Sequence, residues 1–514
     1  MSAIESLVRR TEERRIRASA ELAQNMRARL GQFFTPCEAA DLIAGLPRPM
    51  AVESLRCLDP GAGVGSLSAA VVARVVREGS HRALDLVAVE VDTELLPYLE
   101  ETLRDCIEVA AQYGIAMRST ILNEDVFNAV AGLDGPDSSL GRPFDLAIMN
   151  PPYRKLNSNA PERLALASQG ADCSNIYSGF LAIGAAVLRP GGQLTAIVPR
   201  SFANGPYFGP FRKFFLNMMA LDKIHTFESR STVFGDAGVL QENVVIAATR
   251  QGARGTVNLS ISNGHKDTVT TRQVDYRTVV DPSDPHKFIR VLAGDADLAV
   301  SSAFANLPCA IHEVPVQVST GRVVDFRTRE NLLPWPEGDS FPLIYPSNLR
   351  AGRVEWPMRL RKPQALGARP GVAKLLLPHE RYVLVKRFSS KEERRRVVAA
   401  LFEPNDFDHE CVGFENHLNV FHQNSRGLPQ ALASGLNVWL NSTIVDRFFR
   451  TFSGHTQVNA TDLRSLRYPT RCQLEELGCA VGFERLPDQE KIDALVGLHI
   501  LAPNVQALEE TTER

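Results

Sequence analysis

The amino-acid sequence predicts an α/β protein in which a doubly wound, mostly parallel sheet is followed by a second domain of the α+β type. Several short apolar runs in the first half are typical of buried strands, and polar residues follow them. A glycine-rich turn links one of these strands to a stretch of helical composition, as in folds that bind ligands at the carboxyl ends of parallel strands. The length of 514 residues exceeds one ordinary core, so we expect two domains.

The glycine-rich turn comprises residues 58–66. It follows the plausible strand 55–58 and leads into residues 67–76, which have helical composition. Glycines at such a turn permit tight geometry and let the backbone approach a ligand closely. A dinucleotide is the default ligand of such a loop taken alone, so the residues that follow decide the interpretation.

Two acidic residues accompany the next two predicted strands. The apolar run 86–92 carries Glu90, at a distance from the loop that suits a carboxylate accepting from both hydroxyls of a ribose. Asp125 follows the candidate strand 117–122, on the side expected for an adenine ring. The candidate ligand-binding residues along this edge are Asp59, Gly61, Ala62, Gly63, Glu90 and Asp125.

The tetrapeptide Asn150-Pro151-Pro152-Tyr153 follows the apolar strand 144–149. Proline fixes φ and lacks a donor, so two prolines hold the neighbouring carbonyls in place. Such an edge can accept both hydrogens of an exocyclic amine, while the tyrosine offers a face to a flat ring. The tetrapeptide therefore favours methylation of a nucleobase amine, and a proline-rich turn without a catalytic role is the alternative.

Glycine loop, ribose acid, adenine-side acid and Asn-Pro-Pro-Tyr occur here in the order of an S-adenosylmethionine-dependent methyltransferase. A dehydrogenase would explain the glycines and Glu90 but would leave the tetrapeptide without a role. Residues 30–250 resemble an amino-group DNA methyltransferase of the gamma class, typified by the TaqI enzyme. The resemblance implies a Rossmann-like catalytic domain and S-adenosylmethionine as its cofactor.

The segment before the glycine loop extends this resemblance. Residues 31–36 resemble the family's first motif, which closes over the methionine end of the cofactor. The resemblance implies that Phe34, Thr35 and Pro36 contact the cofactor, together with Asn150.

Segments after the tetrapeptide also match the family. Residues 174–180 resemble the helix that follows the catalytic motif, and residues 188–199 resemble a turn and strand that continue the sheet. Residues 233–235, with 242–247 after them, resemble the late motif, whose aromatic side chain stacks on an extruded base. By this correspondence Phe234 is the second stacking face, opposite the tyrosine of the tetrapeptide.

The mechanism implied is direct attack by the amine of a flipped base on the sulfonium methyl group. The Asn150 side-chain oxygen and the Pro151 carbonyl would accept from that amine. Cytosine-C5 methyltransferases instead use a Pro-Cys nucleophile with a Glu-Asn-Val motif, and this chain contains both motifs. However, Cys37 precedes the glycine loop, so we interpret it as a small, partly buried residue at the start of a helix.

The domain boundaries follow changes in sequence texture. Residues 1–30 are expected to form an N-terminal helical segment, and residues 31–270 the catalytic domain. Residues 285–514 contain all three tryptophans and include the predicted strands 316–323 and 382–387. In the gamma class the C-terminal region recognises the target sequence, so the resemblance implies an α+β target-recognition domain here.

The net charge of −2 does not by itself indicate nucleic-acid binding, so local charge decides. Basic residues gather in 381–396 and at 359–362, and either group could contact phosphates or form a solvated face. Residues 451–459 resemble a loop in the recognition half of related methylases, with a polar cap on the helix 460–466 as the alternative. The candidate DNA-binding residues are Lys386, Arg387, Arg394, Arg395, His455, Gln457 and Asn459.

Composition agrees with a cytoplasmic enzyme. No apolar run reaches the length of a membrane span, and the charged N-terminus lacks the core of a secretory signal. The eight cysteines show no Cys-x-x-Cys pair, so we expect reduced thiols and neither structural zinc nor another metal.

In length and texture the chain resembles the solitary methylases of PstI/BsuBI-type restriction-modification systems. That resemblance implies adenine-N6 methylation of double-stranded DNA within CTGCAG, which protects host DNA from a separately encoded endonuclease. Cytosine-N4 methylation is the first alternative, although Asn at position 150 favours adenine. Methylation of RNA or of a protein glutamine, and a DNA-binding module with an inactive methyltransferase fold, are the others.

Overall fold

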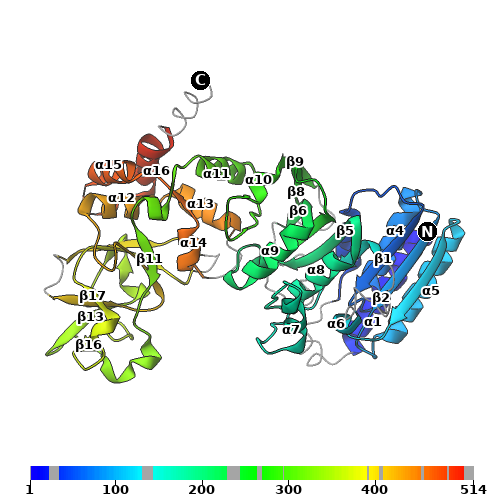
Figure 1. The fold of residues 1–514 in the computed structure, drawn as a ribbon, viewed down its shortest axis with the longest axis horizontal. Coiled ribbons are helices and arrows are strands. Elements are labelled where there is room, and N and C mark those ends of the chain that lie inside the picture. The colour runs from blue at the N-terminus through cyan, green and yellow to red at the C-terminus, as the bar shows by residue number, and fades with distance from the viewer. Residues whose placement is uncertain are drawn as a thin grey trace. The chain divides into compact units, whose positions relative to one another are not determined.

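The structure is a computed structural model. It describes residues 2–21, 34–129, 140, 143–227, 243–262, 269–292, 294–389, 393–404, 409–452, 457–482 and 485–502. Its contacts divide the chain into two compact units, Met1–Ala293 and Gly294–Arg514, which run from blue to green and from green to red in Figure 1.

The described residues of the first unit form one sheet of nine strands in the order β3-β2-β1-β4-β5-β7-β6-β8-β9. Strands β1 to β5 are parallel, whereas β7 is antiparallel to both of its neighbours. The strands are β1 (Ser54–Pro60), β2 (Ala83–Val89), β3 (Ala116–Leu122), β4 (Phe144–Met149), β5 (Leu188–Pro199), β6 (Met219–Phe227), β7 (Asn243–Arg250), β8 (Thr256–Ser262) and β9 (Thr270–Asp275).

Helices cover both faces of this sheet, as the alternation of side chains along β4 shows. Leu146 and Ile148 join the apolar core built with helices α4 and α5, while Ala147 and Met149 lie next to Gly184 of α8. The helices of this unit are α1 (Ala3–Glu21), α3 (Cys37–Gly45), α4 (Ser66–Glu78), α5 (Leu96–Gln112), α6 (Val126–Ala129), α7 (Pro161–Ser168), α8 (Ile176–Val187), α9 (Gly209–Met218) and α10 (Tyr276–Val279), with 3-10 turns η1 (Arg200–Ala203) and η2 (Pro206–Phe208). The doubly wound α/β fold predicted from the sequence is confirmed.

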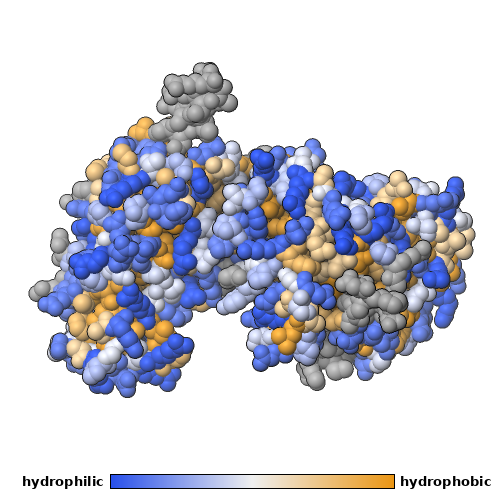
Figure 2. Space-filling model, viewed as in Figure 1, coloured by the Kyte–Doolittle hydropathy of each residue, from blue (hydrophilic) through white to orange (hydrophobic). Residues whose placement is uncertain are grey.

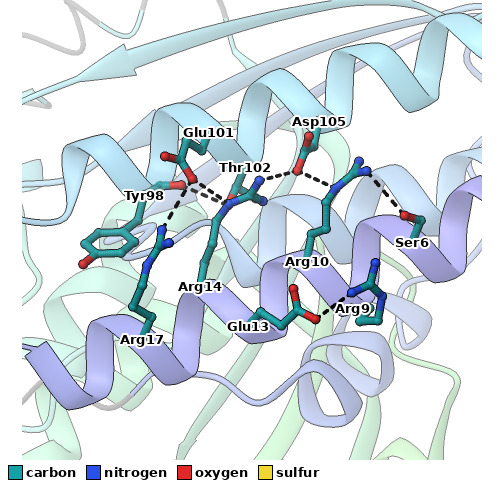
Figure 3. Close-up of polar contacts among 10 residues, drawn as sticks. All are labelled: Ser6, Arg9, Arg10, Glu13, Arg14, Arg17, Tyr98, Glu101, Thr102 and Asp105. Atoms are coloured by element: carbon teal, nitrogen blue, oxygen red, sulfur yellow. Dashed lines mark hydrogen bonds and ion pairs between the residues drawn. The ribbon is translucent and has the colours of Figure 1, made fainter.

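Helix α1 packs on α5 through a ladder of ion pairs (Figure 3). Asp105 accepts from Arg10 at 2.9 Å and from Arg14 at 2.5 Å. Glu101 accepts from Arg14 at 3.1 Å and lies 3.6 Å from Arg17. The arginines are three or four residues apart, so they share one face of α1. The N-terminal helix is therefore part of the first unit.

The second unit is of the α+β type, as predicted. Its described residues form sheets in the orders β11-β21-β18-β19-β15-β14, β12-β16-β13-β20-β17 and β10-β22. The strands are β10 (Cys309–Ala310), β11 (Gln317–Thr320), β12 (Leu332–Leu333), β13 (Ser340–Ile344), β14 (Leu349–Arg350), β15 (Arg353–Val354), β16 (Ala365–Gly367), β17 (Leu376–Pro378), β18 (Tyr382–Lys386), β19 (Ala399–Phe402), β20 (Cys411–Phe414), β21 (Leu418–His422) and β22 (Arg467–Tyr468).

The helices of the second unit are α11 (Asp295–Ala305), α12 (Gln430–Leu440), α13 (Thr443–Phe452), α14 (Ala460–Arg464), α15 (Arg471–Val481) and α16 (Gln489–Val496), and 3-10 turns η5 (Asp325–Arg327) and η6 (Arg329–Asn331) lie before β12. The two larger sheets share a core to which Ile344 and Phe414 contribute from one and Leu384 and Phe402 from the other.

Most strands predicted from the sequence are confirmed, but several strand bounds and one domain boundary differ. The apolar run predicted to extend to residue 92 ends as β2 at Val89. Residues 188–199, predicted as a turn and a strand, form the continuous strand β5. The first unit continues past residue 270, because β9 pairs antiparallel with β8 and completes the sheet.

On the face shown in Figure 2, hydrophobic residues are scattered among hydrophilic ones on both units. Within the described part of the chain, no helix has the length and apolar character needed to cross a membrane.

Candidate active site

A cavity of about 230 Å³ opens at the carboxyl ends of β1, β2, β3 and β4. The register of these parallel strands places their ends together, with Pro60 opposite Val89 and Val89 opposite Leu122. The side chains and backbone that line the cavity belong to Phe34, Thr35, Gly61, Ala62, Gly63, Val64, Ser66, Leu67, Val89, Glu90, Val91, Leu95, Glu124, Asp125, Val126, Phe127, Asn150, Pro152, Arg154, Ile176 and Phe180.

The glycine turn forms one wall of the cavity. The N–H groups of Gly61 and Ala62 both donate to the Val89 carbonyl, at 2.8 and 3.0 Å, which ties the end of β1 to the end of β2. Gly61 and Gly63 have φ values of +73° and +58°, a conformation that favours glycine. A Cβ on Gly61 would lie 3.2 Å from the Phe180 ring. The turn therefore brings bare backbone to the cavity, as the sequence predicts.

Glu90 is fixed beside this turn by backbone donors. Its Oε2 accepts from the Gly63 N–H at 2.7 Å, and its Oε1 accepts from the Asp92 N–H at 2.9 Å. The side chain is buried, and burial raises the pKa of Glu90. Each carboxylate oxygen keeps a second lone pair, so the group can accept further hydrogen bonds from a ligand hydroxyl.

Asp59 was predicted to bind the ligand, but it does not line the cavity. Its carboxylate is fully buried beneath α4, where Oδ2 accepts from the Ser68 hydroxyl at 2.6 Å. Oδ1 has no hydrogen-bond partner among the described residues. Burial raises the pKa of Asp59 to about 7, with a smaller contribution from the charge of Glu90. Asp59 supports the glycine turn from behind.

The far wall is acidic at its rim and apolar within. Asp125 accepts from the Phe127 N–H at 2.9 Å and so begins the short helix α6. The rings of Phe127 and Phe180 meet edge to face, with centroids 5.8 Å apart. Val91 and Ile176 add further apolar surface. These four apolar residues were not predicted, because nothing in the sequence separates them from ordinary core positions.

The segment before α3 closes another side. Phe34 lies over the glycine turn, 3.6 Å from where a Cβ of Gly63 would lie. The Thr35 hydroxyl accepts from the Asn150 side-chain amide at 3.0 Å. Pro36 caps α3 and does not line the cavity, so of the three predicted residues only Phe34 and Thr35 reach it.

Asn150 directs its amide between two partners. Its Nδ2 donates to Thr35, and its Oδ1 accepts from the Tyr153 hydroxyl at 3.4 Å. Pro152 lines the cavity, whereas Pro151 is buried behind it. The structure therefore brings the predicted tetrapeptide to the predicted ligand-binding edge.

Tyr153 belongs to an aromatic group that extends away from the cavity. Its ring meets Tyr177 edge to face at 6.1 Å, and Tyr177 lies 5.4 Å from Phe208. Burial, with a smaller effect of Tyr177, raises the pKa of Tyr153, so its hydroxyl stays protonated at neutral pH. Tyr177 and Phe208 were not predicted. Phe234, the predicted second stacking face, lies outside the described residues.

The arrangement suits a nucleoside-like ligand. It offers a carboxylate for hydroxyl groups, bare glycine backbone, apolar walls for a flat ring and an amide oxygen beside a tyrosine ring. Over the part of the chain that the structure describes, no group of three or more His, Cys, Asp or Glu side chains could hold a metal ion.

Two separate segments predicted to bind DNA come together in the second unit. Phe388 forms an isolated β-bridge with Gln457, and the Val458 N–H donates to the Arg387 carbonyl at 2.7 Å. Lys386, which ends β18, is half-buried beside them. Phe388 is 44% exposed and adds an aromatic side chain that the sequence did not single out.

The other four predicted DNA-binding residues do not share one environment. Arg394 is exposed, but Arg395 turns inward and donates to the Ser442 carbonyl at 2.8 Å and to Gln489. Asn459 is the N-cap of α14, where Asp462 accepts from its backbone and its side chain, so the capping alternative holds for this residue. His455 lies outside the described residues.

Known proteins match both units. Residues 101–234 match the family model described as Eco57I restriction-modification methylase. The chain is 40% identical to the type II methyltransferase M.BsuBI of Bacillus subtilis over 459 residues, which are 88% of this chain and 90% of the relative. It is 38% identical to the type II methyltransferase M.PstI of Providencia stuartii over 482 residues, which are 93% and 94% of the two chains.

Among solved structures, the type IIL restriction-modification enzyme MmeI, solved in complex with DNA, superposes with a TM-score of 0.51 at 13% identity. The match covers 89% of this chain and 73% of the MmeI chain. At this identity the similarity concerns the fold alone.

Proposed function

Because this chain belongs to the type II restriction-modification methyltransferases, we propose that it transfers a methyl group from S-adenosylmethionine to the N6 amine of an adenine in duplex DNA. The orientation of Asn150 carries the proposal. Its amide nitrogen donates to Thr35, which leaves the amide oxygen on the side of Tyr153. A ring stacked on Tyr153 could donate its exocyclic amine to that oxygen.

The cavity would hold the nucleoside part of the cofactor. The Glu90 carboxylate would accept from the ribose hydroxyls, and Asp125 would accept from the adenine amine. Val126 and Phe127 would contact the purine ring, and Phe34 would cover the methionine side. When bound, S-adenosylmethionine supplies an electrophilic methyl group, and these residues hold it in place.

The residues of the tetrapeptide would then prepare the base. Flipping a base out of a duplex costs a few kcal/mol, and stacking on an aromatic ring returns about 1–3 kcal/mol. Tyr153 provides one such face, and we assign the opposite face to Phe234. The Asn150 oxygen and the Pro151 carbonyl would accept the amine hydrogens, so that the nitrogen lone pair points at the methyl carbon. As the nitrogen–carbon bond formed, the carbon–sulfur bond of the sulfonium would break to leave a neutral thioether, and the amine would release one proton to water. Positioning supplies most of the rate.

We assign target recognition to the second unit. Lys386, Arg387 and Arg394 would contact phosphates, and Gln457 would reach a base edge or a phosphate. The identity of 38–40% extends over nearly the whole of M.BsuBI and M.PstI, so both units have counterparts in these relatives. We therefore propose that the chain protects host DNA from a separately encoded endonuclease, with CTGCAG as the first sequence to test.

Mass spectrometry of nucleosides from duplex DNA incubated with the protein and S-adenosylmethionine tests this function. N6-methyladenine is the expected product, and sequencing of the modified DNA would give the site. N4-methylcytosine would leave the proposed geometry in place but contradict the preference for adenine inferred from Asn150. Unmodified DNA would contradict the proposal, and RNA and protein substrates would come next.

The role of Asn150 has a sharper test. Asn150→Ala removes the amide oxygen, so we expect turnover to fall by about a hundredfold or more, with cofactor affinity changed much less. Asn157→Ala, at an exposed loop position outside the cavity, is the matched control and should act like the wild type. Equal loss of turnover and of cofactor binding in Asn150→Ala would place Asn150 in the cofactor site alone.

A further inference from the structure

A large apolar side chain stands out from the second unit on the 3-10 turn η5. The Phe326 side chain is 65% exposed, more than any other described phenylalanine. Burying a phenyl ring is favourable, but single exposed apolar side chains are common on protein surfaces, so the surroundings of Phe326 decide whether it has a partner.

The turn is held to the body of the unit by its neighbours, which turn inward. Asp325 accepts from the Tyr345 hydroxyl at 2.9 Å and from the Lys362 ammonium at 2.8 Å. The Tyr345 ring is buried, and Lys362 also lies over it, 5.3 Å from the centroid. Thr328 closes the other end by donating to the Val324 carbonyl. With Asp325 fixed in this way, Phe326 is directed outward before any partner binds.

The surroundings of Phe326 are basic. The Arg327 guanidinium lies 5.4 Å from the Phe326 ring centroid. The contact between Lys362 and Asp325 also places the basic group 359–362 beside this turn. Arg327, Arg329, Arg359 and Arg361 are exposed and have no ion-pair partner among the described residues. Glu330 and Glu355 are exposed acidic residues near them in the sequence.

We infer that this turn is a DNA contact, in which Phe326 stacks on a base or wedges between two base pairs while the surrounding arginines neutralise phosphates. Four guanidinium groups without ion-pair partners among the described residues favour a polyanion, and not an apolar or acidic protein surface, as the partner of this turn. Phosphates repeat along a duplex, so one DNA molecule can contact several of these groups. A single phenyl ring on a rigid turn is the form that inserted side chains take when they unstack a base step. The inference rests on the proposed function, since it takes duplex DNA as the substrate.

Phe326→Ala tests the stacking contact. Leu498→Ala is the matched control, because Leu498 is also 65% exposed and lies in the same unit. The probe is a duplex that carries the site found by sequencing DNA modified by the wild type, or plasmid DNA where no site is found. We expect Phe326→Ala to weaken binding by about tenfold or more, Phe326→Trp to restore it, and Leu498→Ala to bind as the wild type.

The arginines have a separate signature. Losing Arg359 and Arg361 together should reduce the slope of log affinity against log salt by about two, since each phosphate contact contributes about one. Arg471→Ala, which removes an arginine already paired with Glu475, should leave the slope unchanged. Cofactor binding should be unchanged in all of these variants.

The outcomes separate this inference from the proposed function. If the wild type binds and methylates duplex DNA while Phe326→Ala behaves identically, the turn is not a DNA contact and the function stands. If the wild type binds no duplex DNA, both fall. The fluorescence of 2-aminopurine, which rises when the base is unstacked, separates wedging from base flipping. If 2-aminopurine beside the target becomes fluorescent with the wild type but not with Phe326→Ala, and 2-aminopurine at the target responds to both proteins, Phe326 acts as a wedge distinct from base flipping.

Discussion

Asp59 gives the most direct test of the physical description of the site. Its carboxylate is fully buried, and one of its oxygens has no hydrogen-bond partner among the described residues. Burial raises its pKa from 3.8 to about 7. As pH rises, the unfolded chain releases this proton first, so the folded state becomes less stable between the two pKa values and its stability is constant above the upper one.

The magnitude follows from the size of the shift. A difference of about three pKa units corresponds to about 4 kcal/mol, at about 1.4 kcal/mol per unit. Between about pH 5.5 and about pH 8.5 the part that is lost is about 2 kcal/mol. Asp59→Asn cannot ionise, so its free energy of unfolding relative to the wild type should rise by that amount over this interval.

Urea denaturation followed by far-UV circular dichroism measures this difference. All three tryptophans, Trp335, Trp356 and Trp439, lie in the second unit, so tryptophan fluorescence provides an internal control that the substitution should leave unchanged. The comparison uses the change with pH, because the Asn amide has its own fixed cost in a buried site. A stability difference that stays constant with pH, or shrinks as pH rises, would refute the reasoning.

Three further predictions concern the two units. Asp105→Ala should destabilise the first unit by about 1–2 kcal/mol, because it leaves the mostly buried Arg14 without one of its carboxylates. Glu13→Ala breaks an exposed ion pair and should cost less than about 0.5 kcal/mol. Urea unfolding followed by circular dichroism compares the two variants, and equal effects would contradict the ladder of ion pairs in Figure 3. Gly435→Ala should destabilise the second unit by about 3 kcal/mol or more, since its Cβ would lie 1.7 Å from the Leu474 carbonyl oxygen where α12 crosses α15. Gly497→Ala is the control, because a Cβ there would meet open space and the stability should not change. Tryptophan fluorescence measures the unfolding of this unit, and unchanged stability in Gly435→Ala would contradict the close crossing. Glu90→Gln should weaken S-adenosylmethionine binding by about tenfold or more in calorimetry, whereas the exposed Glu94→Gln should not, and unchanged affinity in Glu90→Gln would remove Glu90 from the cofactor site.

The sequence was sufficient to predict the position of residues that follow the parallel strands. Glu90, Asp125 and Asn150 follow β2, β3 and β4, and a parallel sheet brings these ends to one edge. Asp59 was misplaced because β1 continues through Pro60, so Asp59 still belongs to the ladder, opposite Ala88, and its side chain lies on a face of the sheet beneath α4. An acid inside a strand and an acid just beyond it look alike in sequence.

Charge and polarity were less reliable guides than strand position. Arg395 and Arg394 are adjacent in a basic run, yet one donates to buried carbonyls and the other is exposed. Phe127 and Phe180 form a wall of the cavity, but their apolar character is the same as that of core residues. In each case the deciding fact is a contact between residues distant in sequence, which no local pattern contains.

The N-terminal helix shows how such distant contacts reach the Asn150 amide. Glu12 of α1, held by Arg15 at 2.6 Å, accepts from the Cys37 N–H at 3.1 Å and so anchors the first residue of α3. Thr35 lies two residues earlier and accepts from Asn150 at 3.0 Å. Since the ion-pair ladder fixes α1 on α5, the direction of the Asn150 oxygen depends on a helix that never touches the cavity. Asn150 can thus be recognised in the sequence, whereas the contacts that orient its side chain cannot.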